Sequence, residues 1–421
     1  MNENDSERLA GLLVSGGAEP APAIEDSDII IINTCAVRQK SEEKLFSLLG
    51  RIARMKRKKT LIVGVAGCVS QLYRSELLEK NPVIDFVLGP DNFWQVQNIL
   101  EQSAGEKIVA TSWSRTWHAT APDRLHRQST ITAFVTIMEG CNNFCSYCVV
   151  PYTRGREKFR PAESIMTEIR DVAQKGFKEI QLLGQNVCAY RDPETQMDFS
   201  ELLRRASGVH GIQWIRFLTS HPKDFNKDLA VAMKESSKVC HQLHLPVQSG
   251  SSAILKKMNR GYTREEYLNT IDMIRSHLPD ASFSTDIIVG YPDETEDDFL
   301  ETLAVLERVR FTNIFSFRYS PRPLTAAAKK QDSVPFEIKR RRLIEVQALQ
   351  KQIQVEINRK LIGQKILVLT LGKNRKDPQI FTGRNEAFQV VNFTANQNVI
   401  GQFVQVEITS CGPYSLRGHA V

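Results

Sequence analysis

The chain has 421 residues, of which 42% are hydrophobic and 24% are charged, and its formal net charge is +7. This length suggests about two or three domains. The composition is typical of a soluble globular protein, and the charge suits an acidic partner such as nucleic acid. We expect a cytoplasmic protein with no membrane partner, because the sequence shows neither a long apolar run nor a signal peptide.

Residues 1–105 predict a doubly wound α/β domain with a parallel sheet. The first residues are helix N-cap types followed by leucines, so a helix comes before any strand. Runs rich in Ile and Val, typical of strands buried on both faces, lie at 27–37, 60–69 and 83–89. The segment 40–59 predicts a crossover helix, and 106–130, which lacks any period, predicts a linker.

The centre and the C-terminus predict two further domains. Over 127–357, strand-like runs alternate with helical segments, which indicates a full or partial β/α barrel. A long helix predicted over 337–363 closes this region. Short alternating strands with Gly and Asn turns then predict a small antiparallel β-barrel over 360–421.

Among the eight cysteines, the strongest chemical signal is a CxxxCxxC motif directly after a predicted strand, formed by Cys141, Cys145 and Cys148. A structural zinc site usually has four protein ligands, whereas three thiolates leave one metal position open. Iron–sulfur clusters are held by Cys thiolates, and a free fourth iron could bind a substrate atom. A zinc knuckle or three unrelated core cysteines are the alternatives; Tyr147 within the motif and the barrel context count against both.

Cys35 and Cys68 form a second pair of interest. Each follows a predicted parallel strand, at the edge where open α/β sheets bind ligands. The alternative is two buried small hydrophobic residues, which free cysteines often are. The remaining cysteines lack a spacing partner, so we expect structural roles for Cys188, Cys240 and Cys411.

Together these features resemble the radical S-adenosylmethionine methylthiotransferases over essentially the whole chain. The tRNA-modifying (MiaB-type) branch is indicated by the stretches MNENDSE, NTCAVRQKSEEK, CVVPYTRGRE, LLGQNVCAY, LHLPVQSGS, MNRGYT and YSPRPLTAA. The resemblance implies an N-terminal methylthiotransferase domain, a radical S-adenosylmethionine barrel and a C-terminal TRAM domain that binds RNA.

The resemblance also implies a reaction, namely sulfur insertion and methylation at C-2 of an isopentenylated adenosine beside the anticodon of tRNA. One S-adenosylmethionine supplies the methyl group, and a second is cleaved to a radical that removes the C-2 hydrogen. Two 4Fe–4S clusters are implied, one for the radical step and an auxiliary one that handles sulfur. The partners are then the tRNA and an electron donor such as a flavodoxin or ferredoxin, and we expect a monomer.

The same resemblance assigns the radical cluster to Cys141, Cys145 and Cys148. It assigns Cys35 and Cys68 to the auxiliary cluster, whose third family ligand lies in a GCQMN motif. The Met-Asn of that motif coincides with the start of this sequence, so the third cysteine would fall just before Met1. We expect that an internal methionine was taken as the start; otherwise the first strand and one auxiliary ligand are absent.

The family pattern places the S-adenosylmethionine pocket in loops after predicted barrel strands, with the candidates Tyr147, Gln185, Asn186, Gln248, Ser249 and Gly290. Ordinary turn formation by Gly, Asn and Ser is the alternative. His221 follows another strand, where it either approaches the substrate or forms structural hydrogen bonds.

Candidate RNA phosphate contacts are Arg154 and Arg156, just past the cluster cysteines, and Arg384 in the TRAM-like domain. The basic run 339–342 is more typical of a solvated helix face. Three rival functions remain open. They are a methylthiotransferase for a ribosomal protein, a zinc-stabilised RNA-binding protein without catalysis, and a family member that cleaves S-adenosylmethionine without inserting sulfur.

Overall fold

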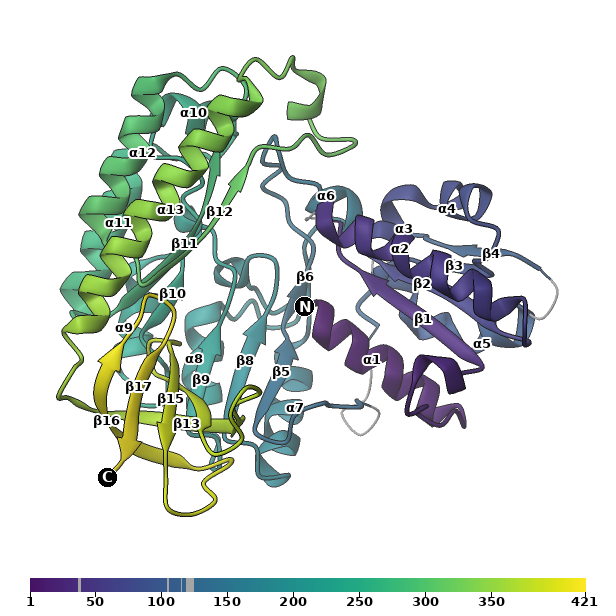
Figure 1. The fold of residues 1–421 in the computed structure, drawn as a ribbon, viewed down its shortest axis with the longest axis horizontal. Coiled ribbons are helices and arrows are strands. Elements are labelled where there is room, and N and C mark those ends of the chain that lie inside the picture. Colours follow the sequence, from purple (N-terminus) through teal and green to yellow (C-terminus); the bar gives the residue numbers. More distant parts are fainter. Residues whose placement is uncertain (37–38, 104–105, 115, 119–124) are drawn as a thin grey trace.

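The N-terminal part of the chain is a parallel sheet with helices on its faces (Figure 1). The computed structural model describes residues 1–421 except 37–38, 104–105, 115 and 119–124. The sheet has the order β1 (Ile29–Thr34), β2 (Ile62–Gly67), β3 (Phe86–Leu88) and β4 (Ile108–Ala110). Its helices are α1 (Asn2–Ser15), α2 (Gln39–Lys56), α3 (Cys68–Tyr73), α4 (Ser75–Lys80) and α5 (Val96–Gln102).

The helix predicted at the N-terminus is confirmed as α1, and it bridges the first sheet and the barrel. Its Leu9 is buried in the apolar cluster of the first sheet. On its other side Asn4 accepts a 2.7 Å hydrogen bond from Thr136, and Arg8 forms a 2.8 Å ion pair with Glu139. The N-terminus therefore lies against the barrel (Figure 1).

Strand β4 lies in the stretch that the sequence assigns to a linker. It pairs with β3 in parallel register, Phe86 with Ile108 and Leu88 with Ala110. Three residues are too short a run to show strand periodicity, and β4 forms because the edge of β3 offers unpaired backbone groups. The first sheet thus extends further along the chain than its sequence pattern indicates.

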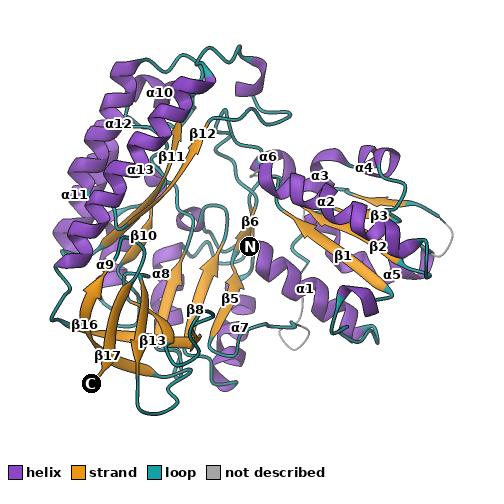
Figure 2. Cartoon of the chain, viewed as in Figure 1, coloured by secondary structure: helices purple, strands orange, loops and turns teal. Residues whose placement is uncertain are grey.

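The centre is a half barrel of parallel strands, as the alternating pattern predicts (Figure 2). One sheet contains β5 (Thr132–Thr136), β8 (Glu179–Leu183) and β9 (Trp214–Phe217); the other contains β10 (Gln242–His244), β11 (Ser282–Val289) and β12 (Asn313–Arg318). A parallel bridge between Ile215 and Val239 connects the two sheets. A short hairpin of β6 (Met138–Glu139) and β7 (Lys158–Phe159) precedes the first barrel helix.

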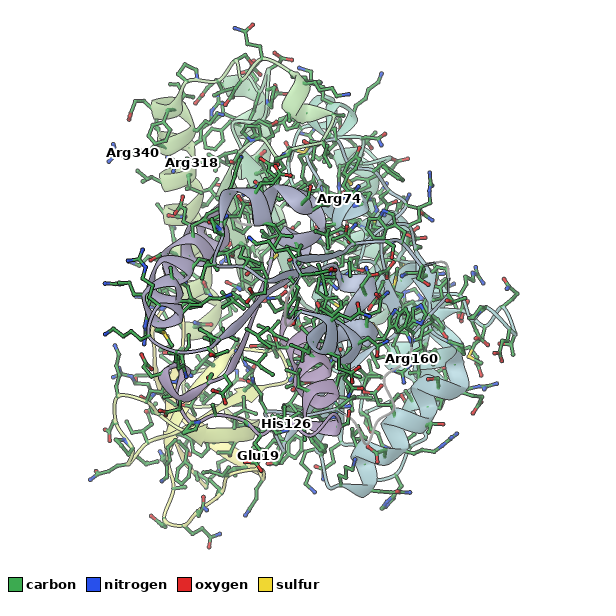
Figure 3. The ribbon with its side chains drawn as sticks, turned by 90° about the vertical axis from the view of Figure 1, so that its right-hand side faces the viewer. Glu19, Arg74, His126, Arg160, Arg318 and Arg340 are labelled. Atoms are coloured by element: carbon green, nitrogen blue, oxygen red, sulfur yellow. The ribbon has the colours of Figure 1, made fainter. Side chains whose placement is uncertain are left out.

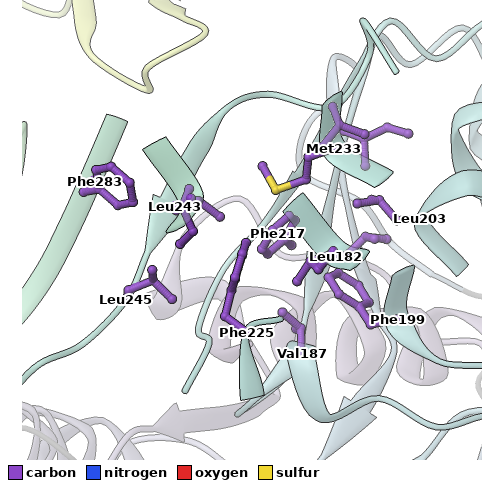
Figure 4. Packing of buried hydrophobic residues seen from close by; sticks show 14 of the residues in the cluster. Leu182, Val187, Phe199, Leu203, Phe217, Phe225, Met233, Leu243, Leu245 and Phe283 are labelled. Atoms are coloured by element: carbon purple, nitrogen blue, oxygen red, sulfur yellow. The ribbon is translucent and has the colours of Figure 1, made fainter. Parts of the chain in front are cut away.

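The barrel helices are α7 (Ala162–Gln174), α8 (Phe199–Ser207), α9 (Lys227–Lys234), α10 (Ser252–Lys257), α11 (Arg264–His277), α12 (Glu296–Val309) and α13 (Phe336–Arg359). Side chains from strands and helices form one apolar core, in which Leu182, Phe217 and Leu243 meet Phe199 and Met233 (Figure 4). Throughout the described residues, no helix combines the length and apolarity needed to cross a bilayer.

The C-terminal part is a closed five-stranded barrel, in the order β13–β14–β15–β17–β16. Its strands are β13 (Lys365–Lys373), β14 (Phe381–Asn385), β15 (Val390–Thr394), β16 (Phe403–Cys411) and β17 (Leu416–Ala420). The expected antiparallel arrangement holds except for β15 and β17, which pair in parallel and close the barrel.

Arg216 on β9 attaches this C-terminal barrel to the half barrel. Its side chain is fully buried, and its Nε donates a 2.7 Å hydrogen bond to the Glu179 carboxylate. Its two terminal nitrogens donate to the backbone carbonyls of Asn385 (2.8 Å) and Glu386 (2.5 Å). The guanidinium also packs on the ring of Phe388, 5.0 Å from its centroid. Every polar face of this buried cation therefore has a partner.

We predict that Arg216→Ala lowers the free energy of unfolding by about 3 kcal/mol or more, because it leaves the Glu179 carboxylate buried and unpaired. The matched control is Arg204→Ala on α8, which removes only solvent-exposed pairs with Asp228 and Glu235 and should cost about 1 kcal/mol or less. Urea unfolding followed by circular dichroism measures both variants. Equal losses in the two variants would show that the buried pair does not stabilise this junction.

Candidate active site

The three motif cysteines lie on one loop that starts after β6 and ends at helix α6 (Val150–Thr153). The backbone of the loop is fixed by its own hydrogen bonds, from Cys141 N to Gly155 O (3.1 Å) and from Cys148 N to Cys145 O (2.9 Å). The Asn143 amide donates a 3.4 Å hydrogen bond to the Sγ of Cys141. All three cysteines of the loop line the same cavity.

Gly140 determines how this loop leaves the strand. Its φ of +81° lies in the left-handed region, and a Cβ there would be 2.0 Å from the Arg156 carbonyl oxygen. Its N–H donates a 2.5 Å hydrogen bond to Oε1 of Gln185. Only glycine fits this position, and Gln185 holds the start of the loop.

Arg260 lies behind the cysteine loop, almost completely buried. It donates hydrogen bonds to the Sγ of Cys145 (3.3 Å), the Tyr147 hydroxyl (3.4 Å) and the Pro246 carbonyl (2.6 Å). Burial, together with the neighbouring Cys145 sulfur, raises the pKa of the Cys148 thiol to about 12. The Cys148 thiol is therefore protonated at neutral pH, and binding of a metal would displace its proton.

A cavity of about 1280 Å³ opens in front of the loop, at the carboxyl ends of the barrel strands. Such ends carry the active sites of barrel enzymes. The cavity walls also include residues of β12, α13 and the C-terminal barrel. Its lining includes Cys141, Cys145, Tyr147, Cys148, Gln185, His221, Gln248, Arg260, Asp286, Phe315, Phe317, Tyr319 and Tyr414.

Half of the expected S-adenosylmethionine contacts line this cavity, namely Tyr147, Gln185 and Gln248. The other three candidates do not line the cavity and form hydrogen bonds within the protein. Asn186 accepts from His221 N (2.9 Å), Ser249 accepts from Ser251 N (3.2 Å), and Gly290 N donates to Glu294 (2.6 Å). These contacts favour the alternative of ordinary turn formation, in which Asn186, Ser249 and Gly290 stabilise their loops and do not bind S-adenosylmethionine.

Cys35 and Cys68 lie at the same edge of the first sheet, as predicted. Thr34 and Gly67 pair in register at the ends of β1 and β2, and each is followed by one of the cysteines. Adjacent parallel strands lie about 4.8 Å apart, so the two cysteines follow neighbouring strand ends.

Arg154 lies next to this second pair of cysteines and not on the surface. Its side chain is 5% exposed, donates a 3.2 Å hydrogen bond from Nε to Cys68 Sγ, and forms an ion pair with Asp5. The prediction that Arg154 contacts an RNA phosphate is therefore wrong in this structure, because both partners are internal.

The other two predicted RNA contacts, Arg156 and Arg384, lie in different environments. Arg156 is exposed and lies over the ring of Phe144, 5.2 Å from its centroid, so it stays a prediction. Arg384 donates a 2.9 Å hydrogen bond to the Phe388 carbonyl and packs on that ring. Burial lowers the pKa of Arg384. This environment does not favour a phosphate contact for Arg384.

The basic run 339–342 is only in part a solvated helix face. Lys339 and Arg342 are buried, where they pair with Asp332 (2.5 Å) and Glu294 (2.7 Å). Arg340 is exposed on α13, on the same side of the molecule as Arg318 (Figure 3). Long-range ion pairs thus neutralise part of this run.

Family models match three segments of the chain: the radical SAM superfamily at residues 135–306, the uncharacterized protein family UPF0004 at 1–89 and the TRAM domain at 359–421. Among curated proteins, the tRNA-2-methylthio-N(6)-dimethylallyladenosine synthase of Syntrophus aciditrophicus is 44% identical, and the alignment covers 99% of this chain and 92% of the relative. The synthase of Acetivibrio thermocellus is 42% identical, with coverages of 100% and 89%.

The chain belongs to the tRNA-2-methylthio-N(6)-dimethylallyladenosine synthase family. Solved structures agree on the fold. The radical S-adenosylmethionine methyltransferase TsrM of Kitasatospora setae aligns with a TM-score of 0.57 at 14% identity, covering 87% of this chain and 75% of TsrM. The cobalamin-dependent radical enzyme OxsB aligns with a TM-score of 0.52 at 12% identity, covering 83% and 53%.

For this member of the synthase family, sequence analysis missed Arg260 as a partner of the cysteine loop. The signal was present, because Arg260 lies in the MNRGYT stretch that carries the family resemblance. Spacing alone could not show it, since Arg260 and Cys145 are far apart in the sequence and meet only in the folded barrel.

We predict that Gly140→Ala abolishes iron incorporation at the cysteine loop, because the new Cβ would collide with the backbone at Arg156. Gly176→Ala is the matched control, since Gly176 has a similar φ of +86° but open space around its Cβ position. Iron and acid-labile sulfide per chain after anaerobic reconstitution measure the effect. Normal iron content in Gly140→Ala would contradict the role of this glycine.

Proposed function

We propose that this chain catalyses methylthiolation at C-2 of N(6)-isopentenyladenosine next to the anticodon of tRNA. The observation that carries the proposal is the preformed three-cysteine loop, which opens into the large cavity at the carboxyl ends of the barrel strands. Relatives that align over nearly the whole chain are tRNA-2-methylthio-N(6)-dimethylallyladenosine synthases, and their activity indicates the substrate.

The chemistry of the cysteine loop fits a 4Fe–4S cluster. Three soft thiol ligands from one loop would hold three irons of such a cluster and leave its fourth iron without a protein ligand, whereas a structural zinc site would take a fourth protein ligand. When bound, this cluster would supply the electron that cleaves S-adenosylmethionine.

The protein residues around the loop orient and shield this chemistry. The Arg260 guanidinium donates a hydrogen bond to Cys145, and its positive charge would offset the negative charge of thiolates that hold a cluster. Gln185 fixes the entry of the loop, and Tyr147 closes one wall of the cavity. A bound substrate that fills the cavity would exclude water from the loop, which reactive intermediates require.

We further propose that Cys35 and Cys68 are ligands of an auxiliary 4Fe–4S cluster that handles the sulfur. Both thiols lie at one sheet edge, and Arg154 donates a hydrogen bond to Cys68 there. The proposal includes two S-adenosylmethionine molecules per product, electrons from a flavodoxin or ferredoxin, and a monomeric enzyme in the cytoplasm.

The proposed activity is tested by incubating reconstituted protein with tRNA that carries isopentenyladenosine, followed by mass spectrometry of the nucleosides. We expect the methylthio product from the parent and none from a Cys141→Ala/Cys145→Ala/Cys148→Ala variant. Cys411→Ala, on the C-terminal barrel, is the control and should keep the activity. Zinc in place of iron, or methylthiolation of a ribosomal protein instead of tRNA, would overturn the proposal.

We also propose that the anticodon loop enters at the rim of the cavity formed by β12, α13 and the C-terminal barrel. Exposed aromatic side chains gather there, among them Phe315, Phe336 and Tyr414. Arg318 packs over the ring of Phe336, 4.4 Å from its centroid. Exposed rings beside cations suit an unpaired RNA loop, because bases stack on aromatics and cations meet phosphates.

For this rim we predict that Phe315→Ala and Tyr414→Ala each weaken tRNA affinity by about fivefold or more, the usual loss for one stacked base. Phe46→Ala on α2 removes a similarly exposed ring away from the cavity and should leave the affinity unchanged. Filter binding at fixed ionic strength provides the measurement. Equal affinities for all three variants would place the RNA elsewhere.

A further inference from the structure

The imidazole of His221 is buried, and its ring nitrogens lack hydrogen-bond partners among the described residues. The residue is 5% exposed. Leaving a buried polar group unpaired costs about 1–3 kcal/mol. His221 is among the residues that line the cavity in front of the cysteine loop, so a ligand bound there would lie next to the imidazole.

The backbone around His221 is held firmly. Asn186 accepts a 2.9 Å hydrogen bond from His221 N and donates a 2.6 Å bond to the Asp224 carboxylate. The ring of Tyr262 meets the imidazole edge-on at 5.5 Å between centroids. These contacts fix the ring position while leaving its two nitrogens unused, as expected of a side chain that is pre-organised for a ligand.

The charge state of the imidazole determines which hydrogen-bonding groups a ligand of His221 must carry. Burial, together with the positive charges of Arg260 and Lys223, lowers the pKa of His221 to about 2. The ring is therefore neutral, with one N–H donor and one acceptor nitrogen. A ligand that satisfies both nitrogens must therefore offer one acceptor and one donor. Such a ligand would lie close to the cysteine loop, because Arg260, which acts on His221, also donates a hydrogen bond to Cys145.

We propose that His221 hydrogen-bonds an adenosine group bound in the cavity. Adenosine offers both ring-nitrogen acceptors and exocyclic N–H or hydroxyl donors, which match a neutral imidazole. This inference rests on the proposed function, which brings two adenosines to the site, one in S-adenosylmethionine and one in the tRNA. His221 is then a ligand-binding residue of the reaction.

The test compares His221→Phe, which keeps a planar ring without its nitrogens, with His221→Gln, which keeps a donor and an acceptor. His210→Phe, at an exposed position, is the control. Anaerobically reconstituted protein is used, with iron content and thermal melting recorded for each variant. Equilibrium dialysis gives the affinity for S-adenosylmethionine, and filter binding gives the affinity for tRNA with and without the isopentenylated adenosine.

We expect His221→Phe to melt at or above the parent temperature, to keep its iron, and to lose about tenfold in affinity for one ligand, as the loss of one or two hydrogen bonds implies. His221→Gln should recover part of that affinity. Weaker binding of S-adenosylmethionine assigns the contact to the cofactor, and weaker binding of only the isopentenylated tRNA assigns it to the substrate.

Three results would overturn the inference. Unchanged affinity for both ligands in His221→Phe would leave no role for the nitrogens in binding. A lower melting temperature in His221→Phe would show that the nitrogens have structural partners. Equal losses in His221→Phe and His210→Phe would show an unspecific effect. The proposed function fails separately, when the parent protein itself forms no methylthio product.

Discussion

The buried guanidinium of Arg154 couples the two cysteine sites of this protein. It lies six positions beyond Cys148 in the sequence, just after α6, and bonds Cys68 and Asp5 in the N-terminal domain. Helix α6 packs on α3, which begins at Cys68, and Val149 joins the apolar cluster of the first sheet. The two cysteine sites are therefore joined by one buried, close-packed connection.

The cavity combines parts that are far apart in the chain. The cysteine loop and the barrel strands form its inner wall, and β12, α13 and Tyr414 of the C-terminal barrel form its outer rim. The chemistry-bearing groups lie on loops at strand ends, where a rigid sheet fixes their positions. The exposed rings lie on the outer rim, so the region proposed to hold the cluster is separate from the region proposed to meet the RNA.

Local patterns made most of the fold predictable. The Ile- and Val-rich runs marked β1 and β2, and the spacing of the motif cysteines marked their loop. Long-range partners are invisible in the sequence, and this explains the errors. Arg154 was a candidate for surface chemistry and Arg342 for a solvated face, yet each has a carboxylate partner that only folding brings near. The orphaned nitrogens of His221 are likewise a property of the packed barrel.

The attachment of the TRAM barrel by Arg216 has a consequence for sequence divergence. The guanidinium recognises main-chain carbonyls at positions 385 and 386, and every amino acid supplies a carbonyl. These two residues can therefore be substituted without loss of the hydrogen bonds from Arg216, provided that the turn keeps its backbone conformation. Among distant homologues, the arginine and its acidic partner should persist while the opposing turn varies freely in side chains.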